Sequence, residues 1–560
     1  METYFCQKNK VSPYVDGSNN NEDSLEIFRN TFFRVLDDTN CQKKPENFEN
    51  NFKKVTGEQS NFFSISSDEV QNNIFRLRPG IGNDNVHTNH LVYATENCVQ
   101  FITKLFNAII RHGYFPERML CGEIRPIIKN RLGNMTDSDN YRPVMVSSHF
   151  LKLFEYCLSF SLANSLEIHN NQFGFRSHTS TLMTVTVVKE TIQSYTDNNS
   201  NVFAGFIDLS KGFDKVNHFK LIEKIWSTNI DECVKILMKQ FLLNQTAYVV
   251  HNNCKSEPQK IGNGVRQGGI NSPLLFNFYL SQMVKELCDL KIGCKLGLQY
   301  YPLIAYADDL VVMAPSQSAL QKLLDQVYNE LSALSLTINA SKTKIMVFRP
   351  KGRKFSEGVK ICLNNEVIEI VDNMKYLGVI IASDFCNKLD VERLERAFLR
   401  QSFGCLNKFS NYPQNVKTFL FRTYCTSLYG CELWTELKGC NQAFNSLKIN
   451  FHKAVKRLNN VSYRSSNHEA CISAGMHTFD HIMSYKMFNF GLLLKNSQSV
   501  CLKPIRKFLF TKSKIMKRIA VLGEEKYGVK NILDFDKATI LARISFVFNR
   551  EPRYQGYNPY

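Results

Sequence analysis

The clearest indication of the fold is the stretch Leu303-Ile-Ala-Tyr306-Ala-Asp308-Asp309-Leu-Val-Val-Met-Ala314. Two apolar runs flank a short polar step, a pattern that predicts a β-hairpin with its tip at residues 307–309. Adjacent aspartates at such a tip repel each other, so the fold needs a reason to keep both, and a divalent cation supplies one. Mg²⁺ prefers oxygen ligands and commonly takes one or two carboxylates together with substrate phosphates. A solvated turn is the alternative for an isolated Asp-Asp pair, so the surrounding sequence has to decide.

A third carboxylate stands one hundred residues before Asp308. Residues 202–208 form an apolar run that ends in Asp208 and predict a buried strand. A helix with Leu320, Leu323, Val327, Leu331 and Leu334 on one face follows the hairpin, and a short strand follows Lys342. This order of strand, helix, hairpin, helix and strand predicts an α+β fold with an antiparallel sheet backed by helices. If the strands are neighbours, the three carboxylates converge as two-metal phosphoryl transfer requires.

The charge of the chain is unevenly distributed. The net charge is +18, and residues 383–560 carry 28 Lys and Arg against 13 Asp and Glu. A basic C-terminal third suits a polyanion such as nucleic acid, although a merely soluble basic surface has the same composition. With 44% hydrophobic residues the composition is that of a globular protein.

The 17 cysteines include no Cys-x-x-Cys pair, which argues against a zinc knuckle or finger. Met1–Lys10 has no apolar core, so no signal peptide is visible. No apolar run approaches the roughly 20 residues that span a membrane. We therefore expect reduced thiols, no membrane partner, and a location in the nucleus or cytoplasm.

Five further segments accompany the hairpin motif Tyr306-Ala-Asp308-Asp309. They are Asn140-Tyr-Arg142-Pro-Val144, Gln172-Phe-Gly174-Phe-Arg176, Phe206-Ile-Asp208-Leu-Ser-Lys-Gly-Phe213-Asp214, Gly264-Val-Arg266-Gln267-Gly268-Gly269 and Tyr376-Leu-Gly378. Together these six motifs resemble, in the same order, those of the reverse transcriptases of LINE-type, non-LTR retrotransposons, and the resemblance covers about residues 95 to 480.

The resemblance implies RNA-directed DNA polymerase activity with two Mg²⁺ ions, which Mn²⁺ could replace. Asp208, Asp308 and Asp309 would hold the metals, and the carbonyl of Leu209 would complete one site. Phe213 matches the bulky residue that leaves no room for a 2′-hydroxyl, although ordinary core packing is the alternative. The resemblance also implies an RNA template, a DNA primer and deoxynucleoside triphosphates as partners.

Further residues receive roles in substrate binding from the same resemblance. Gln267 and Gly268, followed by Gly269, would form a loop against the nascent base pair, where glycine allows close approach. Lys129 and Arg142 would neutralise the triphosphate, or else be solvated surface residues. Lys342 matches the lysine that would protonate pyrophosphate, with Lys344 as the alternative. Looser candidates for contacts to the nucleic-acid backbone are Arg393, Arg396, Lys453, Lys456 and Arg457.

The implied architecture is a right-hand polymerase with an antiparallel palm sheet and a helical thumb. We expect an N-terminal extension over 1–95, fingers over 96–200, palm over 201–382, helical thumb over 383–470 and a basic C-terminal region over 471–560. No endonuclease or Cys/His module is recognisable, so a separate endonuclease or element RNA-binding protein would be a partner. An RNA-dependent RNA polymerase and a catalytically silent nucleic-acid-binding remnant are the competing interpretations.

Overall fold

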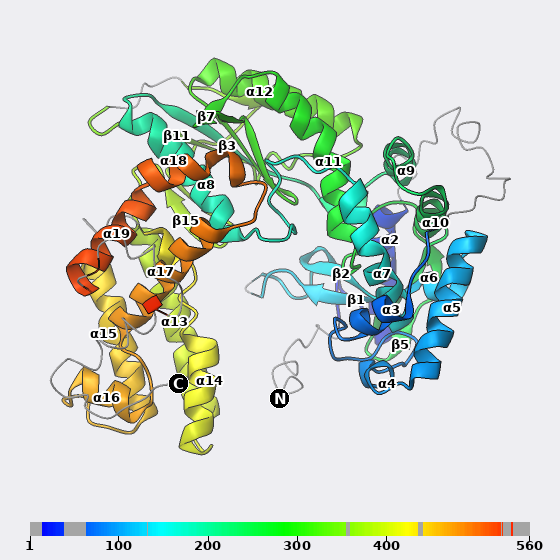
Figure 1. Ribbon diagram of the computed structural model, residues 1–560, viewed down its shortest axis with the longest axis horizontal. Helices are drawn as coiled ribbons and strands as arrows, with labels where there is room; N and C mark the ends of the chain where they lie inside the picture. Colours follow the sequence, from blue (N-terminus) through cyan, green and yellow to red (C-terminus); the bar gives the residue numbers. More distant parts are fainter. Residues whose placement is uncertain are drawn as a thin grey trace. The chain divides into compact units, whose positions relative to one another are not determined.

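The computed structural model describes residues 14–37, 63–131, 133–353, 359–434, 441–527, 529 and 539–540 (Figure 1). The chain divides into two compact units. The first unit comprises Met1–Phe175, Asp208–Glu286 and Gln326–Asn339, and the second comprises Arg176–Ile207, Leu287–Asp325 and Ala340–Tyr560. The Met1–Lys10 segment, on which we based the absence of a signal peptide, lies outside the described residues.

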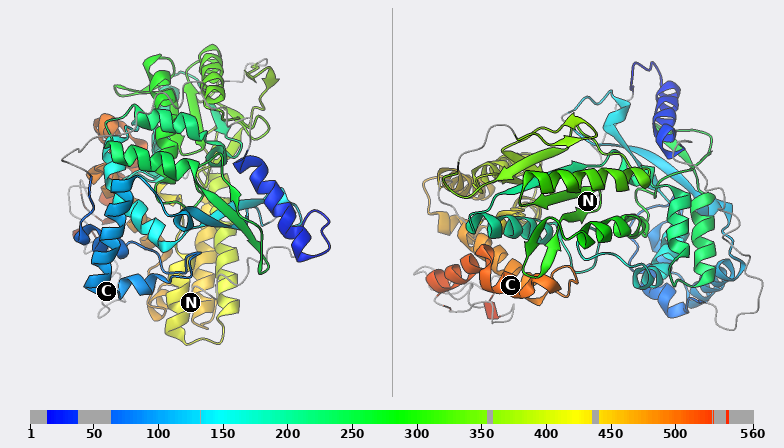
Figure 2. Two further views of the ribbon diagram at one scale, coloured as in Figure 1. Left: turned by 90° about the vertical axis from the view of Figure 1, so that its right-hand side faces the viewer. Right: turned by 90° about the horizontal axis from the view of Figure 1, so that it is seen from above.

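The first unit contains a sheet in the order β2-β1-β4-β5, with β6 also paired to β4. Strand β1 (Cys121–Ile128) is antiparallel to β2 (Tyr141–Val146) and parallel to β4 (Thr246–His251). Helix α2 (Asn21–Leu36) packs against β4, as Figure 2 shows with α2 in dark blue. Its Phe28 is fully buried and meets the Tyr141 ring edge-on at 5.0 Å between centroids. The predicted N-terminal extension therefore contributes to a core.

Helices make up the rest of the first unit. The helical spacing of Val99, Ile102, Leu105 and Ile109 predicts a buried helix face. Helix α5 (Glu96–His112) buries three of these residues, while Leu105 is half-buried, and the helix ends at Gly113, whose φ of +58° is left-handed. The other elements that lie within this unit are α3 (Ser67–Ile74), α4 (Thr88–Val92), α6 (Glu117–Leu120), η1 (Ser138–Asn140), α7 (His149–Ser165), η2 (Gly212–Lys215), α9 (His218–Trp226), α10 (Glu232–Leu243), β5 (Cys254–Lys255) and β6 (Gln259–Lys260). Helices α11 (Ser272–Asp289) and α12 (Gln317–Ala333) contribute residues to both units.

The second unit contains a four-stranded sheet in the order β11-β3-β10-β9. Strand β3 (Val202–Asp208) is antiparallel to β11 (Lys344–Phe348), and β9 (Leu303–Tyr306) is antiparallel to β10 (Asp309–Ala314). Gly205 of β3 lies under α12, because a Cβ there would stand 3.4 Å from Leu324. The predicted order of strand, helix, hairpin, helix and strand is confirmed.

The predicted helix after the hairpin is also confirmed. Its residues Leu320, Leu323, Val327, Leu331 and the following Leu334 are all buried. Smaller hairpins and one further helix complete the part of this unit before residue 383. They are α8 (Thr181–Asp197), β7 (Cys294–Leu296), β8 (Gln299–Tyr301), β12 (Cys362–Leu363), β13 (Glu366–Val367), β14 (Asn373–Tyr376) and β15 (Val379–Ala382).

The described residues after 383 are helical, as predicted. The four-residue repeat of Val416, Leu420, Tyr424 and Leu428 predicts one helix, which is wrong in detail because Leu428 lies beyond the end of α14 (Gln414–Cys425). This helix buries Leu420, Phe421 and Cys425. The remaining elements are α13 (Lys388–Lys408), η3 (Cys431–Leu433), α15 (Asn441–Leu458), α16 (Asn467–Ser473), α17 (Phe479–Asn496), η4 (Lys503–Ile505), α18 (Arg506–Lys512) and α19 (Lys514–Tyr527).

The core of this helical part is aromatic and contains a buried carboxylate. Phe398, Phe421 and Phe451 belong to one cluster of buried side chains together with Trp434. The indole of Trp434 donates a hydrogen bond to Asp390 at 2.8 Å. A buried carboxylate is costly unless it is paired, and Asp390 is paired on several sides.

Two expectations from composition can be compared with the structure. The cysteines in the described part of the chain are all free thiols, as expected. Among the described helices, none is both long and apolar enough to cross a membrane.

Candidate active site

The hairpin of β9 and β10 presents two aspartates at its tip. Asp309 pairs with Tyr306, so Ala307 and Asp308 form a two-residue connection. Ala307 has a left-handed φ of +54° and is buried, which fits the preference of tight hairpins for a positive φ in the loop. Asp308 and Asp309 are both exposed. The predicted tip at residues 307–309 is therefore confirmed.

Strand β3 is the sheet neighbour of β10. It ends at the half-buried Asp208, whereas β10 begins at Asp309. The strands that contain Asp208 and Asp309 are therefore neighbours, which is the condition stated above for the three carboxylates to converge. Within the described residues, no group of three or more His, Cys, Asp or Glu side chains gathers as a metal site. The convergence of the three aspartates on metal ions stays a prediction.

The backbone after Asp208 is fixed against residues 337–339. The carbonyl of Asp208 accepts a hydrogen bond from Asn339 at 2.8 Å, and the Ser210 amide donates to Thr337 at 2.9 Å. These two bonds flank the bridge between Leu209 and Ile338 and do not use the carbonyl of Leu209. This carbonyl is the one that the sequence comparison assigned to a metal.

The ring of Phe213 lies against a second ring. Phe213 and Phe276 are stacked at 4.4 Å between centroids with 12° between the planes, and Phe175 stands edge-on at 6.5 Å. Phe276 is fully buried in α11, while Phe213 is half-buried. The stack fixes the plane of the Phe213 ring and leaves part of it accessible.

The loop that contains Gln267 and Gly268 is tied to β2. The Met145 amide donates to the carbonyl of Gln267 at 2.8 Å. At Gly268, φ is +114° and a Cβ would stand 2.8 Å from the Met145 carbonyl oxygen. A side chain is therefore excluded at this position for two independent reasons, conformation and close approach.

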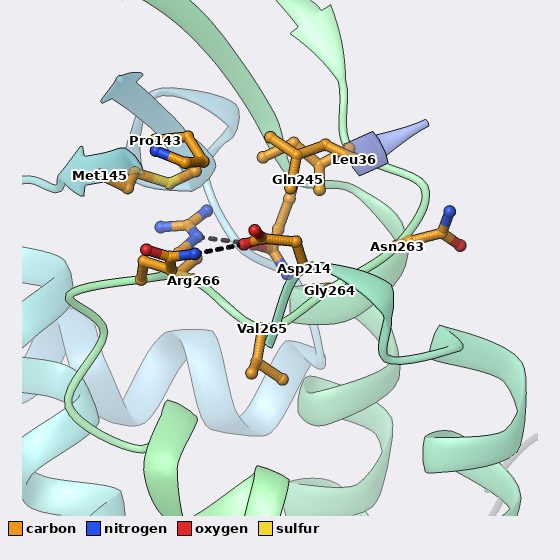
Figure 3. Close-up of a pocket in the computed structure, with 11 residues that line it drawn as sticks. Leu36, Pro143, Met145, Asp214, Gln245, Asn263, Gly264, Val265 and Arg266 are labelled. Atoms are coloured by element: carbon orange, nitrogen blue, oxygen red, sulfur yellow. Dashed lines mark hydrogen bonds between the residues drawn. The ribbon is translucent and has the colours of Figure 1, made fainter. Parts of the chain in front are cut away.

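A buried carboxylate, Asp214, orients the side chain of Gln267. The Gln267 amide donates to Oδ1 of Asp214 at 2.6 Å, and Asp214, which Figure 3 labels beside Gly264, is only 5% exposed. Both residues line a small pocket with Arg266 and Gly264. Asp214 belongs to one of the motifs, but sequence reasoning assigned it no role. Gln267 lies 53 residues further along the chain, so no local pattern reveals its contact with Asp214.

The buried side chain of Arg266 fixes the loop of Gln267 and Gly268 to other parts of the first unit. Its guanidinium is buried and donates to Gln245 Oε1 at 2.6 Å and to the carbonyl of Leu120. Burial lowers the pKa of Arg266 to about 10, and the nearby carboxylate of Glu155 opposes that shift. Arg266 therefore stays charged at neutral pH. Burial raises the pKa of Glu155, which accepts from the Asn271 amide at 3.4 Å.

The two predicted triphosphate ligands lie near the turn between β1 and β2. Arg142 pairs with Ile127 across the two strands, and Lys129 follows β1 directly. The Lys129 ammonium donates to the carbonyl of Asp139 at 2.6 Å. Desolvation lowers the pKa of Lys129, and the cation of Lys211 lowers it further. The sequence did not single out Lys211.

Both candidate lysines lie close to the start of β11. Lys344 Nζ contacts Glu369 Oε2 at 2.6 Å and donates to the carbonyl of Ser341. Lys342 is exposed in the turn before β11. The preference for Lys342 over Lys344 as a proton donor to a substrate stays a prediction.

Tyr376 and some basic residues of the helical part have structural partners. Tyr376 is buried edge-on against Phe206 at 5.4 Å, and burial raises its pKa well above the ordinary value. Arg393 contacts Asp390 at 2.6 Å, and Lys456 is buried and donates to Tyr463. Arg393 and Lys456 are therefore poor candidates for backbone contacts to nucleic acid. Arg396 and Lys453 are exposed.

Residues 128–381, which include all of the motif aspartates, match the family described as reverse transcriptase (RNA-dependent DNA polymerase). The chain carries a reverse transcriptase domain. This match, together with the α+β elements and the antiparallel pairs of the β11-β3-β10-β9 sheet, confirms the predicted right-hand polymerase class for the domain. The limits of fingers, palm and thumb stay predictions.

The relatives of the reverse transcriptase domain are polymerases of non-LTR mobile elements. The chain is 24% identical to the RNA-directed DNA polymerase from mobile element jockey of Drosophila melanogaster, over 71% of this chain and 44% of the relative. It is 26% identical to the Pol polyprotein of retrotransposable element R2 from Popillia japonica, over 47% of this chain and 38% of the relative. The chain thus spans less than half the length of these relatives.

Similarity to solved structures is more distant. Apo telomerase from Candida Tropicalis matches with a TM-score of 0.37 and 12% identity, over 82% of this chain and 73% of that one. The assignment of the reverse transcriptase domain does not depend on it.

Proposed function

We propose that this chain is an RNA-directed DNA polymerase that adds deoxynucleotides to a primer 3′-hydroxyl on an RNA template. The observation that carries the proposal is the adjacency of β3 and β10 within the reverse transcriptase domain, since one strand ends at Asp208 and the other begins at Asp309. RNA template, DNA primer and deoxynucleoside triphosphates are the partners that this reaction needs.

The carboxylates of Asp208, Asp308 and Asp309 would hold two Mg²⁺ ions, with the carbonyl of Leu209 as a further ligand. This donor set fits Mg²⁺, because every ligand is an oxygen and because the Leu209 carbonyl is outside the hydrogen bonds of its β-bridge. Mn²⁺ accepts the same ligands and could replace it. Such a metal pair, when bound, activates the attacking hydroxyl and stabilises the leaving pyrophosphate.

The other residues of the site would bind and orient the nucleotide. Lys129 and Arg142 bind the triphosphate, Arg142 by two parallel hydrogen bonds. The Phe213 ring, fixed by Phe276, excludes a 2′-hydroxyl. Gly268 fits closely against the Met145 carbonyl of β2, and the loop would contact the nascent base pair with Gln267 oriented by Asp214.

Completion of the reaction needs a proton on the leaving group. Pyrophosphate leaves as a strong anion, and an ammonium close to it can donate a proton as the bond breaks. We assign this role to Lys342, because it matches the family's lysine at this position and is exposed in the turn before β11.

The test is primer extension on an RNA template with Mg²⁺ and the four deoxynucleoside triphosphates. Asp308→Ala should abolish extension and leave the circular dichroism spectrum unchanged, because Asp308 is exposed at a hairpin tip. Asp325→Ala, which removes an exposed aspartate of α12, serves as the matched control and should extend the primer normally. Full incorporation by purified Asp308→Ala would refute the proposal.

The same assay separates the competing functions. An RNA-dependent RNA polymerase would prefer ribonucleoside triphosphates on the same primer and template. A silent remnant would bind RNA tightly and salt-sensitively, without any Mg²⁺-dependent synthesis.

A further inference from the structure

A lysine without an assigned role lies in the turn that follows β3. Lys211 has a left-handed φ of +55° and precedes the short helix η2. Lysine seldom adopts this conformation, so the surrounding structure imposes it. The Lys211 ammonium lies 3.3 Å from Oδ1 of Asp139, which belongs to η1 between β1 and β2. The side chain of Lys211 is about one-third exposed, at 33%.

Several cations surround Asp139. Its carbonyl accepts from Lys129 at 2.6 Å, and its carboxylate lies 3.8 Å from Arg34 in addition to Lys211. Arg142 is close enough to lower the pKa of Lys129, as Lys211 does. Arg34, Lys129 and Lys211 thus lie around Asp139, and Arg142 is a fourth cation beside Lys129.

A second carboxylate, that of Asp214, does not fully neutralise these cationic side chains. Asp214 raises the pKa of Lys129, as Asp139 does, but it is buried and accepts a hydrogen bond from Gln267. Positive charge therefore exceeds negative charge here. Such an excess favours an anion with several charges.

We propose that Lys211 is a third cationic ligand of the nucleotide triphosphate, next to Lys129 and Arg142, and that Asp139 holds its ammonium until the nucleotide binds. This inference rests on the proposed function. Asp139 is 58% exposed, so its contact with Lys211 is a weak surface ion pair. A phosphate offers several charged oxygens to the same ammonium and makes stronger, charge-assisted hydrogen bonds. The Lys211 ammonium therefore gains when a phosphate oxygen replaces the Asp139 carboxylate as its partner.

Steady-state primer extension tests the proposal with a matched pair of lysines. Lys211→Ala should raise the KM for the deoxynucleotide about tenfold or more, since a hydrogen bond to a charged group has about this worth. Lys211→Arg should recover part of the loss. Lys215→Ala is the control, because Lys215 ends the helix η2 that Lys211 precedes but donates to Thr337 at 2.9 Å. It should leave KM unchanged.

The affinity for primer–template distinguishes the triphosphate from phosphates of the nucleic-acid backbone. Lys211→Ala should leave the Kd for primer–template unchanged while KM rises. An unchanged KM, or a loss of primer–template affinity that accounts for the change, would overturn the assignment.

Binding of inorganic tripolyphosphate, measured by calorimetry, tests the site without DNA synthesis. Lys211→Ala should bind about tenfold more weakly than wild type, and Asp139→Asn should bind more tightly because the competing charge is gone. Equal binding by wild type and Lys211→Ala, or no binding by wild type, would contradict the proposal. If tripolyphosphate binds as expected but no DNA is made, the proposed function fails and the assignment of Lys211 stands.

Discussion

At the scale of single residues, the site depends on side chains that are fixed by partners far away in sequence. Phe213 is fixed by Phe276, Gln267 by Asp214 and Lys211 by Asp139. Each partner restricts the orientation of a group that would touch the nucleotide. Pre-organised groups bind a substrate with a smaller loss of entropy, so these partners should influence selectivity as much as affinity.

Replacement of Phe213 by alanine should admit ribonucleotides. Removal of the ring opens space beside Phe276 for a 2′-hydroxyl, and steric discrimination of this size commonly amounts to about 10–200-fold. We expect the preference for dTTP over UTP, measured as the ratio of kcat/KM values, to fall by at least about tenfold. Phe213→Tyr keeps the ring and should keep the preference. An unaltered ratio in Phe213→Ala would assign the ring to packing alone.

At the scale of elements, α9 is joined to the loop before Gln267. His218, at the start of α9, donates from Nε2 to the carbonyl of Gly264 at 2.7 Å. Gly264 has a φ of +88°, and a Cβ there would stand 2.8 Å from the Asp214 carbonyl oxygen. One buried imidazole therefore helps to position a backbone that also contacts Asp214.

The burial of His218 makes the stability of the fold depend on pH, whereas its hydrogen bond to Gly264 opposes the shift of the His218 pKa. Burial lowers the pKa of His218 to about 4, against an ordinary value of about 6.5. Between these values the unfolded chain takes up a proton that the folded chain does not, so the free energy of unfolding falls as pH drops from about 6.5 to 4. The total loss is about 3 kcal/mol. The urea midpoint of wild type should fall between pH 7.5 and 5.0. His218→Gln should show a smaller fall, and an identical fall in both proteins would contradict this assignment.

The sequence predicted the elements whose signals are local. Alternation and helical spacing were enough for β3, the β9–β10 hairpin and α12. Local spacing was misleading at the end of α14, because Leu428 continues the four-residue repeat but lies beyond the last residue of the helix. The packing of α2 on β4 and the contact between Asp139 and Lys211 were not predictable, because each depends on how segments far apart in the sequence come together.

At the scale of the whole molecule, charge rather than any single motif would govern the affinity for nucleic acid. The net charge of +18 comes largely from residues 383–560. Arg393 and Lys456 have partners in the structure and are partly or fully buried. Lys453 is exposed on α15, and Arg396 is exposed on α13, where it forms a surface ion pair with Glu392 at 3.4 Å. Exposed lysines and arginines can pair with phosphates and release the counterions that surround nucleic acid.

Binding to an RNA–DNA duplex should therefore weaken steeply with salt. A protein that makes about 6–10 phosphate contacts loses roughly 10³–10⁵ in affinity between 50 and 200 mM salt. The double variant Arg396→Ala with Lys453→Ala should reduce the slope of log K against log salt by about 2, since each contact contributes nearly one. Lys285→Ala with Lys322→Ala removes two exposed lysines outside the basic third and should leave the slope unchanged. Equal slopes for both double variants would mean that the basic helices are only solvated. The measurement is fluorescence anisotropy of a labelled duplex across a salt series.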